Sequence, residues 1–174
     1  PYIATGAKLV GLEPSCILSF LDDYTDLLSG CEKTSQVAQN TMLIEEFFLY
    51  AKRQGANPRF LDASKTEKAL VHGHCHQKAL VGTSPALKVL NSIPGIDASD
   101  TKSGCCGMAG AFGFEKEHYD LSMQIGERDL FPTIRANSDC KVLITGVSCR
   151  QQIEHFTSRR PKHVIEVLST ALQK

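Results

Sequence analysis

Two adjacent cysteines stand among four glycines in the stretch Gly104-Cys105-Cys106-Gly107-Met108-Ala109-Gly110-Ala111-Phe112-Gly113. Glycine adopts positive φ without strain and lets main-chain N–H groups approach a ligand closely. Two neighbouring sulfurs can face one site only where the local backbone is irregular. The stretch therefore predicts a loop that folds around a bound group, with further ligands supplied from elsewhere in the chain.

Two other cysteines are placed to reach this loop. Cys75 follows a short apolar run at 69–72 that is typical of a buried strand, and Cys149 follows a similar run at 141–145. Loops at the carboxyl ends of parallel strands are where α/β sheets gather their ligands. We therefore expect four thiols to converge on one site: Cys75, Cys105, Cys106 and Cys149.

Metal ligation is the favoured interpretation of these four residues, because a cysteine pair between glycines seldom serves packing alone. Thiolate is the ligating form, and the predicted position of Cys149 at a helix amino terminus lowers the pKa of its thiol. Two alternatives stay open. The thiols could be buried in a tight core, or Cys105 and Cys106 could form a redox dithiol, although a disulfide between neighbours closes a small strained ring.

Four segments of the chain resemble a known family, the cysteine-rich CCG domain: Gly11–Cys16, His72–Lys78, Gly104–Gly110 and Gly146–Ile153. The domain occurs in the catalytic subunit of heterodisulfide reductase. The closer likeness is to the carboxyl-terminal part of FAD-linked oxidases of the D-lactate, glycolate and D-2-hydroxyglutarate dehydrogenase type. The resemblance implies a domain that follows a ferredoxin-like region and holds an unusual iron–sulfur cluster.

One position departs from the family pattern. The complete motif has five cysteines, whereas Gly146 stands where the first member of the final Cys-x-x-Cys would be. The same cluster therefore cannot be assumed. A cubane cluster, a zinc ion and an empty site remain open.

The chain also contains an internal repeat. Aligning Cys16 with Cys149 pairs residues 8–16 with 141–149 as two copies of a strand, a turn and a cysteine at a helix start. Cys16 is accordingly a candidate cofactor-binding residue of the first copy. We predict an α/β fold of short parallel sheets flanked by helices, with two pseudo-repeated CCG-type units, the first of them truncated. The expected domains are 1–60, the truncated end of the first repeat with connecting helices, and 61–174, the second repeat.

Apolar spacing and turn residues set the other expected elements. Helices are expected at 17–28, 35–53, 84–90, 116–136 with a kink or break at Pro132, 148–157 and 162–172. A short strand is expected from Ile96 to Lys102, leading into Cys105.

Three histidines alternate around Cys75. In an extended backbone His72, His74 and His76 would share one face and the thiol would take the other. Hydrogen bonding to the site or lining its entrance is therefore the favoured role, and only His74 and His76 are ranked as possible accessory ligands.

Several other residues near the motif carry weaker expectations. Glu13 is either an oxygen ligand or, preferably, a charge at a helix amino terminus in front of Pro14. Arg150 and Lys78 either offset thiolate charge or are solvated. Cys31 and Cys140 lie outside the motif and are expected to be small buried hydrophobes.

The composition of the chain disfavours several classes of protein. The 174 residues are 42% apolar, and Lys+Arg equal Asp+Glu at 19 each, which does not favour a nucleic-acid binder. No transmembrane run or cleavable signal is visible. Seven cysteines without the regular spacing of a disulfide scaffold indicate a reducing compartment. We expect a cytoplasmic protein, or one peripheral at the inner face of the membrane.

The sequence favours an iron–sulfur electron-transfer module from a flavin-linked 2-hydroxy-acid dehydrogenase or oxidase. Its expected partners are the FAD and ferredoxin-like domains of a longer parent chain, and FAD would bind only there, because no glycine-rich dinucleotide fingerprint follows a strand here. The isolated chain is not expected to be active as an enzyme. The rival interpretation is a structural zinc-binding or metal-free interaction domain of the same larger protein.

Overall fold

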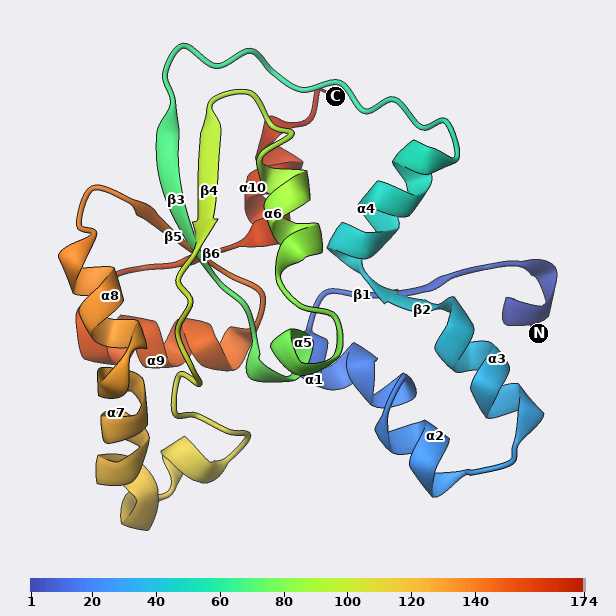
Figure 1. Cartoon of the computed structure of the whole chain (residues 1–174), viewed down its shortest axis with the longest axis horizontal. Helices are drawn as coiled ribbons and strands as arrows, with labels where there is room; N and C mark the ends of the chain where they lie inside the picture. Colours follow the sequence, from blue (N-terminus) through green and yellow to red (C-terminus); the bar gives the residue numbers. More distant parts are fainter. Residues whose placement is uncertain (174) are drawn as a thin grey trace.

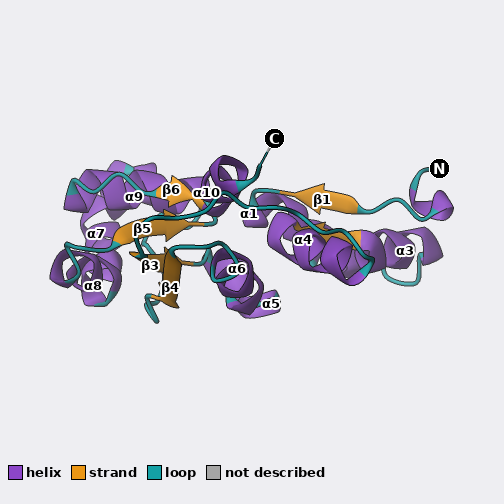
Figure 2. Cartoon of the chain, turned by 90° about the horizontal axis from the view of Figure 1, so that it is seen from above, coloured by secondary structure: helices purple, strands orange, loops and turns teal. Residues whose placement is uncertain are grey.

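The computed structural model describes residues 1–173 as an α/β protein with short parallel strands flanked by helices (Figure 1). The main sheet is parallel throughout and has the strand order β4 (Ile96–Asp100), β3 (Glu67–His72), β5 (Lys141–Ile144) and β6 (Lys162–His163). A separate parallel pair consists of β1 (Leu9–Gly11) and β2 (Thr41–Leu43). Figure 2 shows this pair to one side of the main sheet. The predicted fold class is confirmed.

Helices cover both faces of the main sheet, as Figure 1 shows. Helices α6 (Ser84–Leu90) and α10 (Val164–Ala171) pack on the face that carries Val71 and Leu143. Helices α8 (Leu130–Ala136) and α9 (Val147–Thr157) pack on the face that carries Val142 and Ile144. Burial on both sides explains why the central strands are continuous apolar runs. It also holds their carboxyl ends in fixed positions.

The strand-and-helix repeat extends further than the sequence indicated. Strand β1 corresponds to residues 142–144, and helices α1 (Pro14–Ile17) and α9 begin at equivalent positions after them. The second strands match too, since Gly11 pairs with Leu43 as Ile144 pairs with His163. In each copy a helix begins at the next residue, α4 (Ile44–Arg53) in the first and α10 in the second. The predicted domain division near residue 60 falls in the segment between α4 and β3 and stays a prediction.

The predicted helix at 35–53 is wrong. Helix α3 (Glu32–Asn40) ends where Thr41 becomes extended, and β2 separates it from α4. Pairing with β1 and complete burial of Leu43 override the helical pattern of the sequence. The predicted helix at 17–28 is likewise broken, into α1, a 3₁₀ turn at Leu18–Phe20 and α2 (Asp23–Leu27).

The long helix predicted at 116–136 is also divided. After a 3₁₀ turn at Lys116–His118, α7 (Tyr119–Arg128) ends at Asp129, whose backbone leaves the helical region, and α8 follows. Pro132 lies in the first turn of α8, where its missing N–H is tolerated, so it does not mark the break. The helix predicted at 162–172 begins later, at Val164, because the two residues before it form β6.

The remaining elements are short: 3₁₀ turns at Ile3–Thr5 and Phe112–Phe114, and helix α5 (Cys75–Leu80). No helix within residues 1–173 has the length and apolar character needed to cross a membrane.

A buried polar contact joins α4 to α5. The Gln77 side chain donates from Nε2 to Glu45 Oε1 at 3.1 Å, and both residues are buried. Burial raises the pKa of the Glu45 carboxyl. Gln77 Oε1 has no hydrogen-bond partner among the described residues. The contact therefore contains a carboxyl that resists ionisation beside an acceptor that lacks a donor.

Glu45→Gln is expected to stabilise the protein at pH 7 by about 1 kcal/mol, because a glutamine amide can donate to Gln77 Oε1. A raised folded-state pKa means that Glu45 favours folding when protonated, below the ordinary carboxyl pKa, and that this stability is lost as pH rises through the raised value. Urea unfolding at pH 4 and pH 7 measures both effects. Equal pH dependence of the wild type and the variant would contradict the assignment.

Candidate metal centre

The structure brings the four predicted thiols together at the carboxyl end of the main sheet. Cys75 begins α5 after β3, Cys105 and Cys106 lie in the loop after β4, and Cys149 lies in the first turn of α9 after β5. The side chains interact in series, Cys75 with Cys105, Cys105 with Cys106, and Cys106 with Cys149. Metal ligation by these residues stays a prediction.

The thiols of this series shift one another's pKa values in opposite directions. Interaction with the Cys106 side chain lowers the pKa of Cys105 and of Cys149. Hydrogen bonding to Cys105 raises the pKa of Cys75 and of Cys106. Four crowded thiols cannot all ionise without a cation, since like charges repel at short range. A bound cation would displace protons from these thiols, because the thiolate is the ligating form.

The four thiols differ in exposure. Cys106 and Cys149 are only 4% and 1% exposed, whereas Cys105 is half-buried and Cys75 is exposed. The group therefore has a dry side formed by Cys106 and Cys149 and an open side at Cys75.

Hydrogen bonds hold the cysteine loop in place. Gly107 N donates to Cys105 Sγ at 3.3 Å, and Ser122 Oγ of α7 donates to Gly107 O at 2.8 Å. Gln152 Nε2 of α9 donates to Cys106 O at 3.1 Å and to Ser122 Oγ at 2.8 Å. Two helices thus fix the backbone that carries the adjacent thiols.

Gly107 has both a left-handed backbone and no room for a side chain. Its φ is +95°, and a Cβ there would lie 2.1 Å from Ser122 O. Gly107→Ala is expected to destabilise the protein by at least about 2 kcal/mol, through strain and overpacking. Gly110→Ala is the matched control, because Gly110 has φ +68° but open space around it. Similar denaturation midpoints for the two variants would show that the contact with Ser122 does not matter.

His72 is a site residue that the sequence did not rank as a ligand. It ends β3, is buried, and offers a ring nitrogen that lies with the Cys106 and Cys149 sulfurs within 4.8 Å of one another. The alternation argument does not apply, because the strand ends at His72 and α5 begins at Cys75, so the backbone is not extended through the thiol. The sequence feature that could have pointed to His72 is a histidine at the last position of an apolar strand.

The two histidines ranked as accessory ligands have other contacts. His74 Nδ1 accepts the N–H of His76 at 3.2 Å and caps α5. His76 Nε2 lies 3.5 Å from Asp22 Oδ2. The His74 ring fills the space beside Gly146, whose Cβ would lie 2.7 Å from His74 Cδ2. A side chain at position 146 would therefore collide with this histidine.

The charged residues near the motif serve local contacts. Glu13 Oε2 accepts the N–H of Val147 at 2.8 Å, so its carboxylate stands at the amino terminus of α9, a favourable place for negative charge. Lys78 Nζ donates to Ser103 O and Gly104 O at 2.8 and 2.7 Å, which ties α5 to the cysteine loop. Arg150 pairs with the carboxylate of Glu166 at 2.5 Å.

The remaining cysteines lie outside the series of thiols. Cys16 is exposed in α1, at the position equivalent to Cys149. Cys140 is buried, as predicted, whereas Cys31 is exposed. The expectation of burial for Cys31 is wrong because the loop before α3 lies at the surface.

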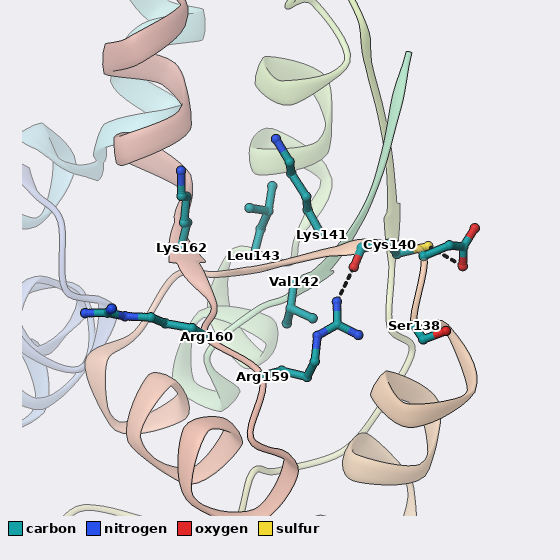
Figure 3. A pocket seen from close by; sticks show the side chains of 9 residues that line it. Ser138, Cys140, Lys141, Val142, Leu143, Arg159, Arg160 and Lys162 are labelled. Atoms are coloured by element: carbon teal, nitrogen blue, oxygen red, sulfur yellow. Dashed lines mark hydrogen bonds between the residues drawn. The ribbon is translucent and has the colours of Figure 1, made fainter. Parts of the chain in front are cut away.

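A cavity of about 300 Å³ lies at the other end of β5 and is shown in Figure 3. Cys140, Lys141 and Arg159 are among its lining residues, and Arg159 donates to Cys140 O at 2.5 Å. None of the four clustered thiols lines it.

Together these features define a parallel α/β protein with a thiol-rich centre at the carboxyl end of its sheet. No family model matches the chain, and no solved structure matches it. Curated relatives do match, among them dehydrogenases and a dehydrogenase subunit. The chain is similar to a subunit of the anaerobic glycerol-3-phosphate dehydrogenase of Escherichia coli, with 30% identity over 174 residues, covering 96% of this chain and 41% of the relative.

Two further relatives are D-2-hydroxyglutarate dehydrogenases. The protein from Pantoea ananatis is 26% identical over 164 residues, covering 94% of this chain and 15% of the relative. The protein from Pseudomonas putida is 29% identical over 171 residues, covering 97% of this chain and 16% of the relative. The chain thus spans from 15% to 41% of the length of these relatives.

Proposed function

We propose that this chain is an iron–sulfur electron-transfer module of a flavin-linked dehydrogenase that oxidises a 2-hydroxy acid or a similar alcohol. The observation that carries the proposal is the convergence of Cys75, Cys105, Cys106 and Cys149 from three separate strand ends. The similarity to dehydrogenases over nearly the whole chain supports it. An iron–sulfur centre would supply one-electron transfer at this place.

The residues present fit such a group. The donor set is rich in thiolate sulfur, which iron–sulfur clusters require. The adjacent pair Cys105-Cys106 sits in a loop that α7 and α9 hold by hydrogen bonds, so both sulfurs are positioned before anything binds. One edge of the group is exposed at Cys75, which gives an electron a short path to a partner.

The proposed partners are the FAD domain and the ferredoxin-like domain of the complete enzyme. Electrons would pass from the reduced flavin through iron–sulfur centres to an acceptor. Under this proposal the chain described here binds no flavin and oxidises no substrate by itself.

A structural zinc site is the second candidate, and the number of thiols favours it. Four cysteines suit the closed tetrahedral site that structural zinc prefers. Such a site would join α5, the cysteine loop and α9 without redox chemistry.

Metal analysis of the full-length protein, purified without oxygen, separates the two proposals. Iron with acid-labile sulfide and a brown absorption spectrum is expected. Stoichiometric zinc in a colourless protein would replace the electron-transfer proposal with the structural one. Protein that holds neither metal after anaerobic reconstitution with iron and sulfide would refute both.

A further inference from the structure

The buried side of the thiol group contains a polar atom that has no partner. His72 is 1% exposed, and its Nε2 makes no hydrogen bond within the described part of the chain. Burying an imidazole nitrogen without a partner costs free energy, so such an atom calls for an explanation. The neighbouring groups that could share a ligand with His72 are thiols. A ring nitrogen of His72 and the sulfurs of Cys106 and Cys149 all lie within 4.8 Å of one another.

This spacing suits ligands of one metal ion. Metal–nitrogen and metal–sulfur bonds of about 2.1 and 2.3 Å place the ligand atoms of a tetrahedral ion about 3.5 to 4 Å apart. The three atoms come from three different elements, β3, the cysteine loop and α9, whose positions the two-sided packing of the sheet fixes. Small adjustments are enough to bring them onto one ion.

The other ring nitrogen is already oriented. His72 Nδ1 lies 3.0 Å from Ser103 Oγ, which in turn lies 2.8 Å from Thr101 Oγ1. If Nδ1 carries the proton and donates to Ser103 Oγ, the lone pair is left on Nε2, the nitrogen without a hydrogen-bond partner among the described residues. Metal-ligating histidines regularly donate their second ring N–H in this way, which fixes both tautomer and ring orientation.

The neighbouring histidines lack this arrangement. His74 Nδ1 accepts a backbone N–H, so in the neutral ring the proton is on Nε2 and no nitrogen lone pair remains for a metal. His76 faces Asp22. Gly146 offers no ligand atom, and the His74 ring occupies the space beside it.

We propose that His72 Nε2 is a nitrogen ligand of the metal centre, alongside the sulfurs of Cys106 and Cys149. The proposal rests on the metal-binding function proposed above and deepens it. The centre then has mixed nitrogen and sulfur ligation on its dry side, and the fifth thiol that position 146 does not supply is not needed.

Full-length protein labelled with ¹⁵N-histidine and purified without oxygen provides the test. Pulsed EPR of the reduced cluster, or of apoprotein loaded with cobalt(II) as the probe metal, is expected to show hyperfine coupling from a directly bound ¹⁵N. His72→Gln should abolish that coupling. It should also weaken cobalt binding by more than the 10- to 100-fold typical of a residue that only orients a ligand.

His163→Gln is the matched control. His163 is also buried, but its nitrogens contact the Thr145 carbonyl oxygen and the Ile165 backbone N–H, so the variant should keep the ¹⁵N coupling. Wild-type protein that binds metal without directly bound ¹⁵N overturns the assignment of His72 and leaves the metal proposal standing. Wild-type protein that binds neither iron nor cobalt refutes both. If His72→Gln does not fold by circular dichroism, the wild-type spectrum alone decides.

Discussion

Cys106→Ser is expected to remove the bound metal from the full-length protein while leaving it folded. The hydroxyl has nearly the volume of the thiol, so the packing around the 4% exposed side chain should persist. It is, however, a hard and weakly acidic donor that binds iron or zinc poorly. Cys106 lies between Cys105 and Cys149 in the series of thiols, so its loss divides the ligand set. Metal content should fall to near zero.

A different result is expected if Cys106 binds no metal. If Cys106 is only a packed thiol, the new hydroxyl should cost about 1 to 3 kcal/mol of stability and leave any metal unchanged. Cys140→Ser is the matched control, because Cys140 is also buried but lies before β5, away from the other thiols. Metal content and melting temperature are measured together for both variants in protein purified without oxygen. Unaltered metal in Cys106→Ser would remove Cys106 from the ligand set.

The sequence was sufficient where local pattern and tertiary structure agree. The apolar runs before Cys75 and Cys149 are strands because both faces of the sheet are covered, which keeps the central residues of β3 and β5 apolar. The placement of thiols after these strands then follows from parallel topology. The repeat of residues 8–16 at 141–149 was visible because both copies keep a strand and a helix start at the same spacing.

Prediction failed where a tertiary contact overrides local preference. Residues 41–43 read as part of a helix, and only pairing with β1 makes them a strand. His72 was not ranked as a ligand for a related reason, since the alternation argument assumed an extended backbone through Cys75, whereas the strand ends at His72. The contact of Glu13 with the amino terminus of α9 joins the two copies of the repeat and has no local signal in the sequence.

Phe131 packs helices α7, α8 and α9 together beside the clustered thiols. Its ring is fully buried in α8, within the same cluster as Cys106 and Cys149. It stacks on Phe156 with ring centroids 5.3 Å apart. It also fills the space beside Gly126 of α7, where a Cβ would lie only 2.2 Å from the ring.

Phe131→Ala is expected to destabilise the protein by about 3 to 5 kcal/mol, because it leaves a cavity that three helices cannot close. For a chain of this length the melting temperature should fall by about 6 to 20 °C. Phe114→Ala is the matched control, since Phe114 is 68% exposed and its loss should cost no more than about 0.5 kcal/mol. Below its melting temperature Phe131→Ala should keep its metal, unlike Cys106→Ser, because no ligand atom is removed. A melting temperature like that of Phe114→Ala would show that α8 does not hold this face of the sheet.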